Sequence, residues 1–109
     1  MFPEALVRRP ILAGCAERVC LDCGTPWERE RRRDRLGTIR GMCACQPARW
    51  RAGRVLDPFM GSGTVGVVAE HVGRDWLGIE LNPAFAAMAE ARIAAARQQK
   101  EMSNERRTA

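Results

Sequence analysis

The sequence predicts an α/β fold that carries a small cysteine-rich insert. Residues 54–101 alternate between short apolar segments and helical patterns, with a glycine-rich loop after the first apolar segment. Residues 17–53 have no sustained helical or strand period and hold four of the five cysteines. Short, nearly continuous apolar strands separated by helices are typical of a parallel sheet covered by helices.

Size and composition restrict the class of protein. With 109 residues the chain is one domain or part of one, and its hydrophobic content of 46% is too high for a disordered chain. The sequence has no run of about 18 apolar residues, so we expect no membrane span. Its first residues do not have the layout of a signal peptide. We therefore expect a cytoplasmic protein, whose cysteines are metal ligands or free thiols rather than disulfides.

The helices are predicted from capping residues and apolar spacing. Pro3 and Glu4 suit the first turn of an N-terminal helix, which Pro10 is expected to kink or end early. Asn82 and Pro83 provide the N-cap and the first turn of the last helix. Apolar spacing places the following residues toward the core: Leu6, Val7, Ile11 and Leu12 on the first helix, and Phe85, Met88, Ala89 and Ile93 on the last.

The chain divides into four segments. A helical segment (1–16) precedes the cysteine- and arginine-rich insert (17–53). A strand–loop–helix–strand–helix unit follows (54–101), and a polar tail (102–109) is expected to fray. Within the α/β unit the predicted elements are strands at 54–57 and 76–80 and helices at 64–72 and 83–99.

The positive charge is concentrated in one stretch. Residues 28–54 hold nine arginines and three acids, a net charge of +6, whereas the whole chain carries +5. A local basic patch of this kind suits contact with phosphates. The densest part, 28–35, is either a phosphate-contacting loop or a solvated excursion of mixed charge, and both interpretations stay open.

The glycine-rich loop indicates a nucleotide-like ligand. Residues 61–66 read Gly-Ser-Gly-Thr-Val-Gly after a strand and at the start of a helix, and Glu80 ends the next strand. Glycines let the backbone approach a ligand closely, and a carboxylate in that place accepts hydrogen bonds from ribose hydroxyls. The alternative is a turn that serves only helix–strand packing.

Asp57 distinguishes two ligand classes. A carboxylate at the carboxyl end of the first strand would repel a pyrophosphate but suits a cationic amino group, such as that of a methionine. This favours S-adenosylmethionine over a dinucleotide, with Phe59 as an apolar wall. The loop also lacks the Gly-Lys-Ser/Thr of a phosphate-binding P-loop.

These residues resemble a known family. The stretch 55–64, Val-Leu-Asp-Pro-Phe-Met-Gly-Ser-Gly-Thr, resembles the cofactor motif of the DNA amino-methyltransferases, which methylate adenine N6 or cytosine N4. The stretch 76–83 resembles their ribose-binding segment, and residues 2–6 resemble the helix that closes over the methionine end. The order of the segments is similar to the C-terminal part of the subclass in which the catalytic motif comes first.

The resemblance implies a fold and a set of site residues. The fold would be part of a Rossmann-like S-adenosylmethionine-dependent methyltransferase domain. Pro3 would belong to the closing helix, and Asn82 would lie beside the adenine or serve only as a helix cap. The implied cofactor-binding residues are Pro3, Asp57, Phe59, Gly61, Ser62, Gly63, Thr64, Glu80 and Asn82.

The catalytic motif implied by the resemblance does not occur in the sequence. That motif is Asp, Asn or Ser followed by Pro-Pro and an aromatic residue that stacks on the flipped base. We therefore expect the chain to be the cofactor-binding C-terminal part of a truncated or split bacterial or phage DNA methyltransferase. Alone it would be inactive, and its partners would be DNA and the missing N-terminal catalytic half.

The cysteines predict a zinc site within the insert. Cys20 and Cys23 form a C-x₂-C pair and Cys43 and Cys45 a C-x-C pair, and four thiolates in two close pairs suit tetrahedral zinc. Free thiols without metal are the alternative. Cys15 is interpreted as a small buried hydrophobic residue. Two other functions stay open for the chain: a zinc-ribbon DNA-binding protein without catalysis, and a dinucleotide-binding oxidoreductase fragment.

Overall fold

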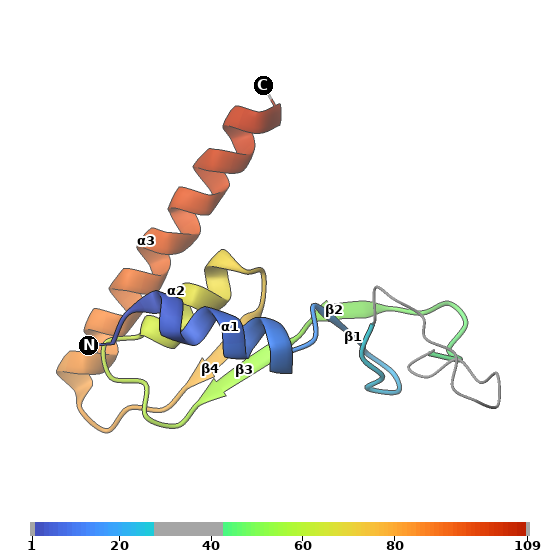
Figure 1. Ribbon diagram of the computed structural model, residues 1–109, viewed down its shortest axis with the longest axis horizontal. Helices are drawn as coiled ribbons and strands as arrows, with labels where there is room; N and C mark the ends of the chain where they lie inside the picture. Colours follow the sequence, from blue (N-terminus) through green and yellow to red (C-terminus); the bar gives the residue numbers. More distant parts are fainter. Residues whose placement is uncertain (1, 28–42, 109) are drawn as a thin grey trace.

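The computed structural model describes residues 2–27 and 43–108. Figure 1 shows a body of packed helices and strands, from which a narrow ribbon extends to one side. The elements, in chain order, are α1 (Glu4–Gly14), β1 (Arg18–Cys20), β2 (Trp50–Ala52), β3 (Arg54–Asp57), α2 (Thr64–His71), β4 (Asp75–Gly78) and α3 (Pro83–Thr108).

Strands β3 and β4 pair in parallel, as the apolar runs predicted. Strand β3 has the predicted bounds, whereas β4 begins one residue earlier than predicted and ends at Gly78. The backbone of the residue that follows β4 still bonds the partner segment, because Ile79 donates to Asp57 O at 2.9 Å and accepts from Met60 N at 3.0 Å. The two strands therefore continue side by side into the loops at their carboxyl ends.

Helix α2 lies at the centre of the body and contacts α1, α3 and both strands. Its residues 66–69 are buried, and it ends just before Gly73, whose φ of +74° allows the chain to turn back toward β4. Gly66 is required by packing, because a Cβ there would lie 2.4 Å from Cδ1 of Ile93 on α3. His71 ends α2 as an ordinary helix residue, with Nδ1 3.7 Å from a Glu4 carboxylate oxygen.

Helix α3 differs from its prediction in length and in its buried face. It continues to Thr108, so the prediction of a frayed tail is wrong for residues 102–108. The extra turns consist largely of residues with good helix propensity, and the Ser103 hydroxyl bonds to Gln99 O within them. Phe85 and Met88 are about half exposed rather than buried. The buried stripe is Ala89, Ile93 and Ala96, at the spacing that faces α2.

Pro10 lies inside helix α1, which continues past it. The helix therefore does not end early at Pro10, which was one of the two predicted effects. Ile11 is buried and Val7 half-buried, while Leu6 and Leu12 are exposed. The predicted apolar stripe is therefore only half right, because α1 packs mainly on α2 and buries the face toward that helix. The last turn ends at Gly14, as expected.

The ribbon pairs β1 and β2 antiparallel, with Arg18 opposite Ala52 and Cys20 opposite Trp50. Each strand has only three residues, which is too short to produce a visible sequence period. In the described part of the chain, no helix is both long and apolar enough to cross a membrane.

Candidate functional site

The loop after β3 is a tight turn built on two glycines in the left-handed region. Gly61 has φ +54° and Gly63 has φ +86°, conformations that other residues adopt only with strain. Asp57 Oδ1 accepts the backbone N–H of Phe59 at 3.1 Å, and Gly63 donates to Met60 O at 3.0 Å. These bonds bring the loop around so that Gly63 is the N-cap of α2.

The carboxylate of Glu80 joins this turn to the loop after β4. Its Oε2 accepts the backbone N–H of Gly61 at 2.7 Å, and its Oε1 accepts that of Asn82 at 3.0 Å. The backbone donors of Asn82 and then Gly61 lower the pKa of Glu80 below its usual 4.5, because they stabilise the charged form. The structure thus places Gly61, the first of the predicted glycines, in direct contact with the predicted acid.

Asn82 caps the last helix. Its Oδ1 accepts the backbone N–H of Ala84 at 2.9 Å, which satisfies one of the free donors of the first turn of α3. The side-chain oxygen is therefore engaged by its own helix, while its backbone N–H is held by Glu80.

The hydroxyls of the loop face α3. Arg92 Nη1 donates to Ser62 O at 2.8 Å and approaches Ser62 Oγ at 3.1 Å and Thr64 Oγ1 at 3.5 Å. Thr64 is buried. Arg92 is a loop-supporting residue that sequence reasoning missed. Its position next to Ile93, the centre of the buried stripe, was the only available signal.

Two apolar side chains beside the loop project into solvent. Phe59 is 88% exposed and Leu81 is 96% exposed, which is unusual for large apolar residues in fixed loops. Pro3 occupies the N-cap position of α1 and is also exposed. Among the described residues, no hydrogen bond joins Pro3 to the glycine loop.

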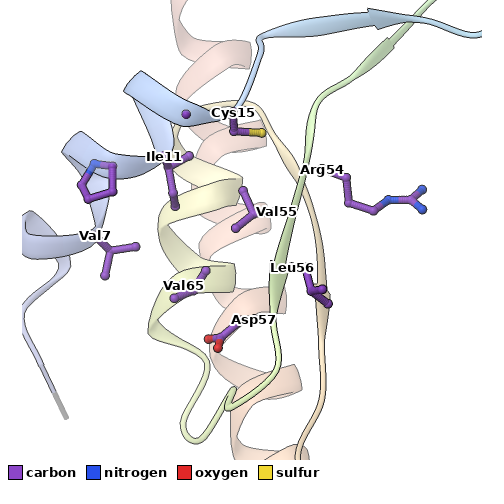
Figure 2. Close-up of a pocket in the computed structure, with 10 residues that line it drawn as sticks. Val7, Ile11, Cys15, Arg54, Val55, Leu56, Asp57 and Val65 are labelled. Carbon is purple, nitrogen blue, oxygen red and sulfur yellow. The ribbon is translucent and has the colours of Figure 1, made fainter. Parts of the chain in front are cut away.

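A pocket of about 370 Å³ lies between α1, β3 and α2. Figure 2 shows Val7, Ile11 and Cys15 of the α1 side opposite β3, with the Asp57 carboxylate near one end. Cys15 lines this pocket and is half-buried, so the prediction that it is a buried hydrophobic residue is only partly right. The lining residues are Val7, Pro10, Ile11, Gly14, Cys15, Arg54, Val55, Leu56, Asp57 and Val65.

A second cluster lies on the ribbon, where the four predicted cysteines meet. The sulfur atoms of Cys20, Cys23, Cys43 and Cys45 all lie within 4.8 Å of one another. Cys43 Sγ lies 3.3 Å from Cys20 Sγ and 3.5 Å from Cys23 Sγ. Cys15 does not belong to this group.

The surroundings of the four thiols separate their pKa values. The Thr25 hydroxyl and backbone lower the pKa of Cys23 to about 6, and the backbone donors of Cys23 and Asp22 lower that of Cys20. Contact with the Cys43 sulfur, followed by the other two sulfurs, raises the pKa of Cys45 to about 12. For Cys43 the Cys45 backbone favours the thiolate, but contacts with Cys20 and Cys23 and partial burial outweigh it and raise the pKa. A cation bound among the four sulfurs would favour the thiolate form of all of them.

Side chains around the cluster hold the ribbon together. The guanidinium of Arg18 lies 4.8 Å from the ring centre of Trp27, within the range of a cation–π contact. Arg49 pairs with Asp22. The predicted arginine-rich excursion, 28–35, lies outside the described residues.

Comparisons with known proteins agree on one family. A family model described as DNA methylase matches residues 1–91. The type II methyltransferase M.SmaI of Serratia marcescens is 56% identical over 41 residues, which are 38% of this chain and 14% of that protein. M.XycI of Xanthomonas campestris pv. cyanopsidis is 54% identical over 39 residues, 36% of this chain and 13% of its own length.

A third relative is more distant. The type II methyltransferase M.HpaI of Haemophilus parainfluenzae is 46% identical over 39 residues, 36% of this chain and 12% of its own length. The chain therefore matches only 12–14% of the length of these curated relatives.

Proposed function

The chain belongs to the DNA methylase family of the N6/N4 type, and from that premise we propose that it forms the S-adenosylmethionine-binding part of a DNA adenine-N6 or cytosine-N4 methyltransferase. The observation that carries this proposal is the bridge from Glu80 to Gly61 and Asn82. It holds an acid and a glycine turn together at the carboxyl ends of two parallel strands, where open α/β sheets bind nucleotides.

The residues present fit this cofactor. A Cβ on Gly61 would meet nothing within 4 Å, so the backbone of the turn faces open space. Each Glu80 oxygen accepts one backbone N–H and keeps capacity for a ribose hydroxyl. Asp57 uses one oxygen for Phe59 and, among the described residues, keeps the other free for a cationic amino group. S-adenosylmethionine would supply an electrophilic methyl group on its sulfonium.

The order of elements supports a partial Rossmann-like domain. Strand β3, the glycine turn, α2 and β4 form one parallel β–α–β unit, and α3 follows Asn82. In this arrangement, Phe59 and Leu81 would cover apolar parts of the cofactor, and the bonds from Arg92 would hold Ser62 and Thr64 in the loop.

We propose that the chain does not transfer the methyl group alone. The sequence contains no Asp, Asn or Ser followed by Pro-Pro and an aromatic residue. The outer face of the sheet also carries an apolar pair, because Leu56 and Leu77 lie opposite each other and are 60% and 54% exposed. A polypeptide with the catalytic motif would complete the sheet and bring the DNA substrate to the cofactor.

The four-cysteine group fits a structural zinc ion. In tetrahedral zinc with four thiolates, the sulfurs are separated by about 3.8 Å. The observed separations of 3.3 and 3.5 Å are close to that value, and every sulfur lies within 4.8 Å of the others. The ligands would be Cys20, Cys23, Cys43 and Cys45.

Calorimetric titration of the purified chain with S-adenosylmethionine and, in parallel, with NAD tests the function. We expect one S-adenosylmethionine per chain, no NAD binding, and at least tenfold weaker binding in Glu80→Ala but not in Glu90→Ala, an exposed acid on α3. Binding of NAD would favour the oxidoreductase alternative. Binding of neither ligand would favour a zinc-ribbon DNA-binding protein. Methylation of DNA by the chain alone would contradict its proposed inactivity.

A further inference from the structure

We propose that a metal ion in the four-cysteine group fixes α1 beside the cofactor loop, so that metal occupancy controls the affinity for S-adenosylmethionine. The coupling rests on the proposed function, because it concerns the same cofactor site. It would make the ribbon a control element for α1 as well as a small structural module.

Helix α1 is weakly attached to the body. Ile11 is its only buried residue, and Leu6 and Leu12 face solvent. Yet α1 forms one wall of the pocket whose other walls are β3 and α2, as Figure 2 shows. A helix with one buried anchor needs a further attachment to stay in place, since each ordered residue costs about 1–2 kcal/mol of backbone entropy.

That attachment is the neck between α1 and the ribbon, defined here as residues 15–17 with Gly53. The Arg74 guanidinium donates to Cys15 O through Nε at 3.4 Å and Nη2 at 3.2 Å. Gly53 N donates to Glu17 O at 3.3 Å, and Gly53 O accepts from Asp75 N at 2.8 Å. The end of α1 is therefore bonded through Gly53 and Arg74 to the start of β4.

The two segments that form the neck, residues 15–17 and Gly53, are in direct contact. A Cβ on Gly53 would lie 1.8 Å from Ala16 O and 3.0 Å from Cys15 Sγ, so only glycine fits while the neck is closed. Glu17 precedes β1 and Gly53 follows β2, so their bond continues the pairing of Arg18 with Ala52. We therefore expect the neck to close when the two ribbon strands are paired.

Pairing of the ribbon strands depends on the metal. With three residues in each strand, the two-stranded ribbon is too short to be stable alone, and bringing Cys20 and Cys43 together across 23 positions of the chain costs entropy. A metal ion bound to both cysteine pairs would tie Cys20, in β1, to Cys43 and Cys45, which precede β2. Binding of a structural metal stabilises the fold that assembles its ligands.

The consequence is a reciprocal linkage. With metal bound, β1 and β2 pair, the neck closes and α1 lies against α2 beside the pocket that reaches Asp57. Without metal, α1 keeps its packing on α2, through Ile11 and the approach of Glu4 to His71, but it loses the closed neck, so the pocket loses that wall for part of the time. Because linkage is symmetric, S-adenosylmethionine would also raise the affinity for the metal.

The test compares the full chain loaded with zinc and the same chain stripped by a chelator under reducing conditions. Amide hydrogen exchange should show protection of residues 4–14 that falls at least tenfold without zinc, with α2 and α3 little changed. The dissociation constant for S-adenosylmethionine should rise at least tenfold. Unchanged protection of α1 would overturn the coupling. Failure of both forms to bind S-adenosylmethionine would instead overturn the proposed function, since the exchange measurement needs no cofactor.

Two neck variants separate coupling from metal binding itself. Arg74→Ala and Gly53→Ala should keep one zinc per chain but lose the zinc-dependent protection of α1. Arg51→Ala is the matched control, because the hydrogen bond of that exposed guanidinium among the described residues goes to the neighbouring Ala52 O. If Gly53→Ala does not fold, Arg74→Ala alone still tests the proposal. Zinc-dependent protection that survives in Arg74→Ala would contradict the route through the neck.

Discussion

Glu80 Oε2 accepts the backbone N–H of Gly61 at 2.7 Å, so the acid that follows β4 holds the turn that follows β3. The same carboxylate accepts the N–H of Asn82 at 3.0 Å. One side chain therefore fixes both loops at the carboxyl ends of the parallel strands. Replacing or protonating it should loosen the turn while leaving the strands paired.

The stability that Glu80 contributes should depend on pH. Its folded-state pKa is lowered from 4.5 by the backbone donors of Asn82 and Gly61, so the contribution is present above about pH 4.5 and is lost as pH falls through the lower folded value. Thermal unfolding of Glu80→Gln should give a lower Tm than the parent at pH 7, and the gap should close in acid. Glu101→Gln, an exposed acid on α3, is the control. A gap that is constant from pH 7 to pH 3 would contradict this role.

Gly63 and Gly61 should respond differently to alanine. A Cβ on Gly63 would lie 2.8 Å from the Ala89 Cβ, whereas one on Gly61 would meet nothing within 4 Å. Both residues have positive φ. We expect Gly63→Ala to lose about 2–4 kcal/mol through strain and a clash, and Gly61→Ala about 1 kcal/mol through strain alone. Denaturant unfolding measures both, and equal losses would argue against the packing of Gly63 on α3.

Phe59 should matter for binding but not for folding. Its side chain is 88% exposed, so Phe59→Ala should change the free energy of unfolding by less than about 0.5 kcal/mol. If the ring packs on the cofactor, its loss should weaken S-adenosylmethionine binding about tenfold or more. Met102→Ala, which removes another exposed apolar side chain far along α3, should leave binding unchanged. Equal affinity of Phe59→Ala and the parent would remove Phe59 from the site.

Cys45 and Cys15 should differ in their effect on metal content. Cys45 belongs to the four-sulfur group and Cys15 does not. After reduction and loading, Cys45→Ser should hold less than about half a zinc per chain, while Cys15→Ser should keep one. Mass spectrometry after gel filtration measures the zinc content of both variants. Loss of zinc from both variants would place the metal elsewhere.

The sequence predicted those features whose causes lie close together in the chain. The glycine turn, strand β3 and the cap formed by Asn82 follow from residues only a few positions apart, and the structure shows each of them. The sequence also predicted that the four cysteines lie together, because their spacing is typical of metal ligands, and ligands of one metal ion must meet in the folded chain.

The sequence did not predict features that depend on contacts between residues far apart in the chain. The bonds from Arg92 to Ser62 span 30 residues, and the bonds from Arg74 to Cys15 span 59. Apart from the position of Arg92 next to Ile93, no local pattern signals either contact. Phe85 and Met88 follow the helical period but lie beside the face that meets α2, and only the packing of α3 on α2 shows which face is buried.

Backbone NMR of the 109-residue chain titrated with S-adenosylmethionine tests the central claim most directly. We expect the amide signals of Gly61, Gly63 and Leu81 to shift together and to saturate at one ligand per chain, with the same signals unmoved in Glu80→Ala. Signals in the groove between His71 and Lys100 should stay in place. Saturable shifts in that groove, with the Gly61 and Leu81 signals unmoved, would contradict the cofactor site described here.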